Sequence, residues 1–272
     1  MIPVGFTYER PDTLDAALAL LAEHGDDAKV LAGGHSLLPV MKLRLAAPEL
    51  LIDIGRLDEL RYSRVDGDQL AIGAGTRHHD LATSDVVAAE APLLGAVART
   101  VGDPQVRHRG TLGGSLAHAD PASDLPAAVL ALGGAIVLRG PRGERKVPVE
   151  EFFTGLFSTA LEPDELVVEI RVPRTGSAGW AYEKFTRRAN DWAIVAVAVV
   201  DGRVGLVNMG STALRASATE AALASGASIP DAAALADQDT DPPSDLAATP
   251  VYRRHLARVL TRRALTTAAE AG

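Results

Sequence analysis

Arg109-Gly110-Thr111-Leu112-Gly113-Gly114-Ser115, which we call the second loop, is the most informative stretch in this sequence of 272 residues. A similar stretch, Ala32-Gly33-Gly34-His35-Ser36, lies earlier in the chain and is the first loop. Paired glycines lack a Cβ, so backbone N–H groups can come close to an anion such as a pyrophosphate. A tight turn is the other interpretation of any Gly-Gly pair. Two such loops in one chain favour a shared phosphate site, but the residues alone leave both interpretations open.

The segments around these loops alternate between strand and helix signals. The apolar stretch 28–32 predicts a buried strand that runs into the first loop, and Ser36 is placed to start a helix after it. Asp12 or Thr13 can cap an earlier helix, which Gly25 is placed to end. Further strands are expected at 50–54, 69–72, 135–139, 145–149 and 166–172, and further helices at 92–101 and about 123–132.

A break rich in proline, glycine and serine at 173–179 predicts a domain boundary. Three antiparallel strands are expected beyond it, with Tyr182, Lys184 and Trp192 all in strands and Asp201-Gly202 as a tight turn. Helical patterns complete the chain. Because strands and helices do not follow a regular βαβ rhythm, the predicted class is α+β. The Gly-x-Gly-x-x-Gly fingerprint is also absent, which argues against a Rossmann domain. The expected strands are 180–186, 193–200 and 204–209, and the expected helices are 219–224 and 252–269.

The composition of the chain excludes several kinds of binding site. The net charge of −8 argues against a nucleic-acid surface, which needs clustered positive charge. The chain has no cysteine, which removes disulfides, Cys-ligated zinc and Cys-ligated iron–sulfur clusters. We see no secretory signal and no apolar run of the roughly 20 residues that a spanning helix needs. The sequence therefore predicts a cytoplasmic protein with no transmembrane segment.

Both loops belong to longer motifs. The first continues as Leu37-Leu38-Pro39, then Lys42-Leu43-Arg44 and Leu51-Ile52-Asp53-Ile54. The second follows Asp103-Pro104-Gln105-Val106-Arg107-His108 and leads to Ala119-Asp120-Pro121-Ala122-Ser123-Asp124-Leu125-Pro126. In order and spacing these motifs resemble those of the molybdenum hydroxylase flavoproteins. That family includes the medium subunit of aerobic carbon monoxide dehydrogenase and the flavin domain of xanthine dehydrogenase. The resemblance continues through Gly179-Trp180-Ala181-Tyr182-Glu183-Lys184 and covers nearly the whole chain.

The resemblance implies a fold and a domain organisation. Residues 1–176 would form a two-lobed FAD-binding domain of the PCMH type, with lobes at about 1–55 and 56–176. Residues 177–272 would form a smaller C-terminal α+β domain, built on a three-stranded antiparallel sheet with helices.

The resemblance also implies cofactor contacts. The first loop would wrap the FAD pyrophosphate, and the second would approach phosphate and ribitol. Asp124, Val167 and Lys184 match further contacts of the family. Ser115 is a departure, since relatives can carry Asp or Asn there, although a hydroxyl still donates and accepts hydrogen bonds. The implied cofactor site is Ala32, Gly33, Gly34, His35, Ser36, Leu37, Thr111, Leu112, Gly113, Gly114, Ser115, Asp124, Val167 and Lys184, with no catalytic residue and no metal ligand assigned.

The function implied by the resemblance is electron transfer. FAD would receive electrons from a small iron–sulfur subunit and pass them to an external acceptor. A large molybdopterin subunit would complete the complex, so that the molybdenum cofactor and the 2Fe–2S clusters lie only on partners. Because there is no cysteine for a cysteinyl link, FAD binding should be non-covalent unless a histidine is used. Two alternatives stay open: a self-sufficient FAD-dependent oxidoreductase acting on a small substrate, and a non-catalytic assembly subunit.

Two histidine–aspartate groups and a row of arginines are further candidates for functional sites. His78-His79-Asp80 and His118-x-Asp120 lack the third and fourth ligands of a metal site. A row of arginines lies about one helical turn apart near the C-terminus, which predicts either a solvated helix face or a docking surface for an acidic partner. The row consists of Arg253, Arg254, Arg258, Arg262 and Arg263.

Overall fold

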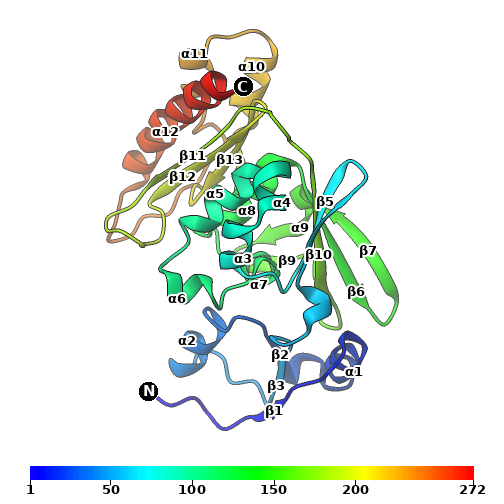
Figure 1. The fold of residues 1–272 in the computed structure, drawn as a ribbon. Coiled ribbons are helices and arrows are strands. Elements are labelled where there is room, and N and C mark those ends of the chain that lie inside the picture. Colours follow the sequence, from blue (N-terminus) through cyan, green and yellow to red (C-terminus); the bar gives the residue numbers. More distant parts are fainter.

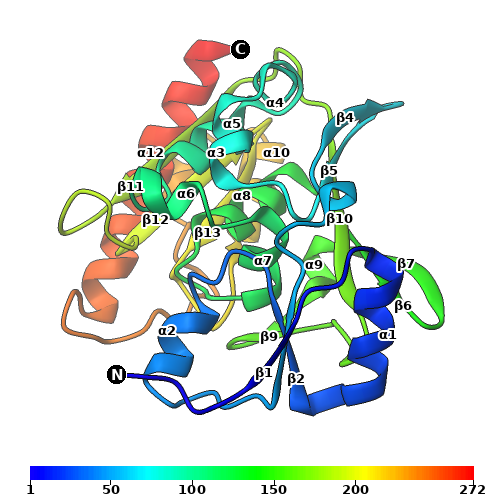
Figure 2. The same ribbon diagram turned by 60° about the horizontal axis from the view of Figure 1, so that its bottom comes forward.

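The N-terminal lobe is built on a parallel three-stranded sheet. We describe residues 1–272 in a computed structural model. The strand order is β1 (Thr7–Glu9), β3 (Leu50–Asp53), β2 (Ala28–Leu31). Helix α1 (Leu14–His24) packs its apolar side against this sheet, capped by the Thr13 hydroxyl and ended by Gly25 at φ 51°, as the sequence predicts. Helix α2 (Leu37–Lys42) follows the first loop. Figure 2 brings this lobe forward, below the rest of the chain.

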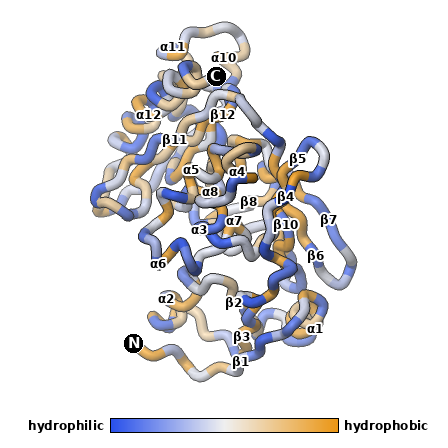
Figure 3. The backbone as a smooth tube through the Cα atoms, viewed as in Figure 1, coloured by the Kyte–Doolittle hydropathy of each residue, from blue (hydrophilic) through white to orange (hydrophobic).

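The middle of the chain forms an antiparallel five-stranded sheet in the order β4-β5-β10-β6-β7. Strands β6 and β7, both expected from the sequence, pair as a hairpin, and β4 is a strand that the sequence did not predict. Figure 3 shows hydrophobic colour along β5 and β10 and hydrophilic colour along the outer strand β7. The strands are β4 (Ser63–Asp66), β5 (Gln69–Gly73), β10 (Leu166–Pro173), β6 (Ala135–Gly140) and β7 (Gly143–Pro148).

Short helices of four to nine residues cover one side of this sheet. The apolar helix α8 (Asp124–Leu132) is almost entirely buried at their centre (Figure 1). The other elements of this part are α3 (His78–Thr83), α4 (Asp85–Glu90), α5 (Pro92–Arg99), α6 (Pro104–Arg107), α7 (Leu112–His118), α9 (Val149–Phe152), β8 (Phe153–Gly155) and β9 (Ser158–Thr159). The two 3-10 turns, Gly25–Asp27 and Asp58–Leu60, belong to the N-terminal lobe.

Strand β10 connects the two lobes. Its pairing with β6 shifts register between Val167 and Glu169. Leu166 and Val168 lie in the core of the N-terminal lobe, whereas Val167 lies in the core of the middle part. Alternate side chains of a strand point to opposite faces, so one strand holds both cores together. This arrangement leaves Val167 at the junction between the lobes.

The C-terminal part is an antiparallel sheet in the order β11-β12-β13-β14, flanked by helices. The three expected strands are present, and a short fourth strand pairs with β13. Asp201 and Gly202 have φ values of 48° and 73°, as a tight hairpin turn requires. The elements are β11 (Trp180–Phe185), β12 (Val195–Val200), β13 (Arg203–Val207), β14 (Leu214–Arg215), α10 (Ser217–Ala224), α11 (Ile229–Ala233) and α12 (Pro250–Ala271).

Strand β12 is buried on both faces and fixes this sheet against the middle part. Ala196 and Ala198 face the core that contains α8, whereas Val197 and Val199 face the core that contains α12. Gly205 allows close packing, because a Cβ there would lie within 3.0 Å of the Ala127 carbonyl oxygen of α8. Figure 1 shows the sheet between α8 and α12. None of the helices combines the length and apolarity needed to cross a membrane.

Candidate functional site

A cavity of about 910 Å³ lies where the two lobes and the C-terminal sheet meet. A volume of this size is typical of sites for large organic ligands. Its lining includes every predicted site residue except Leu112, whose side chain is fully buried in the core. The predicted lining residues are Ala32, Gly33, Gly34, His35, Ser36, Leu37, Thr111, Gly113, Gly114, Ser115, Asp124, Val167 and Lys184.

The first loop presents free backbone donors to this cavity. The N–H groups of residues 32–37 have no hydrogen-bond acceptor in the chain, although all six residues line the cavity. Gly34 has φ 78°, a conformation that L side chains rarely adopt. Ser36 precedes α2 as expected, but its hydroxyl makes no capping bond and is also free. A concave row of unpaired N–H groups is a binding site for an anion.

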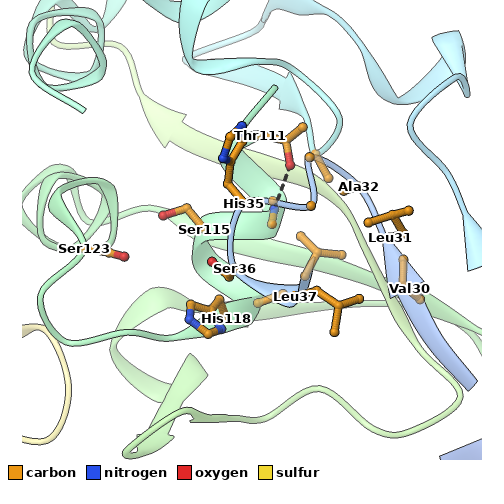
Figure 4. Close-up of a pocket in the computed structure, with 18 of the residues that line it drawn as sticks. Val30, Leu31, Ala32, His35, Ser36, Leu37, Thr111, Ser115, His118 and Ser123 are labelled. Carbon is orange, nitrogen blue, oxygen red and sulfur yellow. Dashed lines mark hydrogen bonds between the residues drawn. The ribbon is translucent and has the colours of Figure 1, made fainter. Parts of the chain in front are cut away.

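The second loop works differently from the sequence-based expectation. All of its amides except that of Thr111 are already used within the protein: for example, Leu112 donates to Thr76 O, Gly113 to Ala74 O, and Gly114 to the Thr111 hydroxyl. Of the two glycine pairs, only Gly33-Gly34 therefore has amides without an acceptor in the protein. Instead, the second loop offers hydroxyl groups. Figure 4 shows the Thr111–Gly114 bond as a dashed line and the side chains of Ser36, Ser115 and Ser123 around one space.

Glycines in the two loops allow close backbone packing, between the loops at Gly33 and against Ala74 at Gly113. A Cβ on Gly33 would lie 2.8 Å from Gly110 Cα and closer still to the Arg109 carbonyl oxygen. A Cβ on Gly113 would lie 2.8 Å from Ala74 O. Real Cβ atoms do not approach backbone this closely, so these positions require glycine. Gly33 thus brings the two loops together at the cavity wall, and Gly113 packs the second loop against Ala74.

A buried ionic cluster forms the opposite end of the cavity. Lys184 Nζ lies 2.7 Å from Asp124 Oδ2 and donates to Thr100 O at 3.1 Å. The Tyr182 hydroxyl donates to Asp124 Oδ1 at 2.5 Å. An ammonium group has three donors, so Lys184 keeps one N–H for a ligand. Asp124 lies on α8 and Lys184 on β11, so the cluster also joins the C-terminal sheet to the middle part.

Burial dominates the electrostatics of this cluster. Burial raises the pKa of Asp124, and the nearby Lys184 only partly counteracts the effect. Burial and the adjacent Asp124 carboxylate raise the pKa of Tyr182 well above its ordinary value. The tyrosine therefore stays protonated and donates its hydrogen bond at neutral pH. Asp124 holds Lys184 in place, and both residues line the cavity.

His78 lines the cavity behind the second loop. It is buried, its Nδ1 has no hydrogen-bond partner, and its ring would lie 2.7 Å from a Cβ on Gly110. Burial, together with repulsion from His35 and Arg107, lowers its pKa to about 4. The imidazole is therefore neutral at pH 7 and must gain a proton when acid unfolds the protein.

The lowered pKa of His78 predicts that the free energy of unfolding falls as the solution becomes acidic. Because the folded pKa lies below the ordinary 6.5, the unfolded state binds more protons between about pH 4 and 6.5, and the free energy of unfolding rises with pH there. We expect this rise to be about 3 kcal/mol from His78, and His78→Gln to flatten it. Urea unfolding from pH 4.5 to 7 measures the slope. The control is His24→Gln, at an exposed helix end; equal slopes in parent and His78→Gln proteins would contradict the assignment.

Two aromatic residues border the cavity, and the sequence identified only one of them. Trp192 was expected in a strand, but it lies in the loop before β12, lines the cavity and is 59% exposed. This correction arises because the strand pattern begins three residues later, at Val195. Phe157 also lines the cavity, at φ 52° between β8 and β9, with His118 beside its ring. No local sequence signal marks Phe157, because its position depends on the folded hairpin.

The arginine row on α12 is largely engaged within the chain. Arg253 is fully buried and pairs with Asp245 Oδ2 at 2.6 Å. Arg254 donates to Asp237 O and Thr240 Oγ1, and Arg258 lies 3.6 Å from Asp237. The row is therefore neither a uniformly solvated face nor a continuous free surface for a partner.

Fold and cavity together define a two-lobed cofactor-binding protein with a C-terminal sheet domain. Residues 4–175 match the family described as FAD binding domain in molybdopterin dehydrogenase. Residues 180–268 match the CO dehydrogenase flavoprotein C-terminal domain. The chain belongs to the FAD-binding medium-subunit family of the molybdenum hydroxylases, which are oxidoreductases.

Several relatives match over nearly their whole length. The carbon monoxide dehydrogenase medium chain of Hydrogenophaga pseudoflava is 45% identical, over 98% of each chain. The 6-hydroxypseudooxynicotine dehydrogenase complex subunit alpha of Paenarthrobacter nicotinovorans is 38% identical, over 97% of this chain and 95% of that one. A solved structure of carbon monoxide dehydrogenase from Hydrogenophaga pseudoflava superposes with a TM-score of 0.96 at 46% identity, covering 100% of this chain and 99% of that one.

Proposed function

We propose that this chain binds FAD non-covalently in the cavity, with the pyrophosphate on the first loop. The observation that carries the proposal is the row of free N–H groups at residues 32–37, which have no acceptor in the protein. A pyrophosphate supplies the negative oxygens that such a row binds. The hydroxyls of Thr111 and Ser115 then face the phosphate and ribitol. With no cysteine in the chain, a cysteinyl flavin link is impossible.

At the other end of the cavity, Lys184 and Trp192 are placed for the isoalloxazine ring. Trp192 offers an aromatic face of the kind that stacks on a flat ring. Lys184 offers one N–H and a positive charge, which stabilise negative charge on a reduced ring. Bound FAD supplies the redox chemistry, and the chain's own residues orient it and tune its potential. Val167 contributes a buried apolar contact from β10.

We place this subunit in a complex as an electron relay. Electrons would arrive from a small iron–sulfur subunit and leave from FAD to an external acceptor, with substrate oxidation on a large molybdopterin subunit. Support comes from the absence of cysteine, since thiolate-ligated clusters must then lie on another chain. Relatives of similar identity are named for substrates as different as carbon monoxide and 6-hydroxypseudooxynicotine. The substrate would therefore be chosen by the partner that holds the molybdenum centre.

We also propose the domain division 1–176 and 177–272, with lobes at about 1–55 and 56–176. Strand pairing supports it: the sheets of the first domain contain strands up to Pro173, and the last sheet starts at Trp180.

Flavin reduction in the assembled complex tests the relay. FAD on the isolated chain should stay oxidised when carbon monoxide or another substrate of a relative is added without oxygen. Adding the iron–sulfur subunit, reduced beforehand with dithionite and freed of excess reductant, should bleach the flavin absorption. Rapid reduction of the isolated chain by substrate would instead indicate a self-sufficient oxidoreductase. An oxidised flavin in the presence of the reduced iron–sulfur subunit would contradict the relay.

A further inference from the structure

The loop at residues 186–194 joins β11 to β12 and brings Trp192 to the cavity. No backbone hydrogen bond connects Trp192 to the rest of the chain. More than half of its side chain is exposed, so packing does not fix its position either. The position of Trp192 therefore depends on how the two stems of the loop are held.

Side chains from two other elements hold these stems. Asn208 Nδ2, which is buried after β13, donates to the Ala193 carbonyl oxygen at 2.9 Å. Arg253 Nη1 on α12 donates to the Ile194 carbonyl oxygen. On the other stem, the ring of Tyr252 meets Phe185 edge to face, with centroids 6.3 Å apart. Residues at the start of α12 thus contact both stems of the loop, and Figure 1 shows α12 beside β11 and β12.

Arg253 is an unusual residue for this place. It is 0% exposed, and its neighbours on the inner face of α12, such as Leu256 and Ala257, are apolar. Its only partners are the Ile194 carbonyl oxygen and Asp245, and its Nε has none. Only the arginine side of this pair is buried, since the Asp245 side chain is 47% exposed, and a guanidinium buried in this way is commonly no better for stability than an apolar replacement. Stability of the core therefore does not explain a guanidinium here, whereas a fixed donor to the Trp192 loop does.

We propose that Arg253 is a positioning residue for the cofactor site, which sets Trp192 against the isoalloxazine ring by holding the loop at Ile194. Asp245 orients the guanidinium, and Asn208 and Tyr252 complete the grip on the loop. The inference rests on the proposed function, because it assumes that the cavity holds FAD.

The test uses the fluorescence of Trp192 in the full-length chain. The protein has two tryptophans, so a Trp180→Phe parent reports Trp192 alone. FAD should quench this emission in the parent. In Arg253→Met, the quenching should fall by about half or more, and the Kd for FAD should rise about threefold to tenfold, the range expected for losing an aromatic contact. Arg254→Met, the neighbouring arginine bonded to Asp237 and Thr240, is the matched control and should match the parent in both.

A double-mutant cycle separates positioning from general destabilisation. In a Trp192→Ala background, Arg253→Met should no longer change the Kd, because the contact that it positions is already absent. If Arg253→Met does not fold, the cycle is run with Tyr252→Ala, whose side chain is 42% exposed, and an effect of about twofold should likewise vanish. Additive effects, or a Kd and quenching unchanged from the parent, would overturn the inference. If the Trp180→Phe parent binds no FAD, the proposed function itself is overturned. Failure of the proposed function can therefore be told apart from failure of the positioning inference.

Discussion

We expect the Gly33→Asp variant to purify without FAD and to fail to retain added FAD. A Cβ at this position would lie 2.8 Å from Gly110 Cα and nearer still to the Arg109 carbonyl oxygen, so the two loops must move apart. The new carboxylate would also add negative charge beside the free N–H groups of residues 32–37. We estimate a loss of at least about 4 kcal/mol in binding, or about a thousandfold in Kd, since steric strain and charge repulsion add. Flavin absorbance per protein after desalting measures retention.

The same substitution at Gly5 provides the control, because a Cβ there meets nothing within 4 Å. Gly5→Asp adds the same charge to the same lobe and should leave the FAD content unchanged. Gly114→Asp should also lose FAD, by a different route, because its Cβ would lie 2.7 Å from the Thr111 hydroxyl that caps α7. Normal flavin content in both Gly33→Asp and Gly114→Asp would contradict the proposal that these loops bind the pyrophosphate.

The second large effect is expected from Lys184→Met. This change leaves Asp124 buried without its ion-pair partner, which costs about 3–5 kcal/mol of folding stability. It also removes the N–H that faces the cavity, and the loss of a charged hydrogen bond should weaken FAD binding about tenfold to a hundredfold. Urea unfolding and FAD titration measure the two quantities. Lys146→Met, an exposed lysine that contacts only Gln69, is the control and should change neither.

The stability loss in Lys184→Met should depend on pH in a defined direction. The folded pKa of Asp124 is raised by burial, so its ionised form opposes folding, and the penalty is absent below its ordinary pKa of 3.8. Removing Lys184, which lowers this pKa, raises it further. The difference in free energy of unfolding between parent and variant should therefore grow as the pH rises from about 4 towards 7. A difference that is constant or shrinks with rising pH would contradict the ionic cluster. The titration of His78 is common to both proteins and cancels.

Local signals in the sequence predicted much of this fold. The two ends of α1, at Thr13 and Gly25, were predictable because helix capping depends only on neighbouring residues. The turn at Asp201-Gly202 was predictable for the same reason. The two glycine loops were identified because close approach of backbone leaves a requirement for glycine in the sequence itself. Strand β4, with the polar sequence Ser63-Arg64-Val65-Asp66, lacks an apolar pattern and was missed.

Features that depend on tertiary contacts could not be predicted from local patterns in the sequence. Both loops carry the same Gly-Gly pair, yet the amides of the first are free and those of the second are occupied, because Ala74 and Thr76 lie beside the second loop. Tyr182 was expected to lie in a strand, but its bond to Asp124, 58 residues away in the sequence, has no local signal. The bond from Arg253 to Ile194 joins residues 59 apart in the sequence, and no local pattern announces it.

The most direct test of the central claim is a visible absorption spectrum of the purified chain, recorded before and after FAD is added and after denaturation. We predict a flavin spectrum, with the cofactor released intact by denaturation because it is held non-covalently. The released flavin should be FAD, at about one per chain after reconstitution. A chain that stays colourless after reconstitution would contradict the assignment of the cavity and, with it, the role of this protein as a flavin subunit.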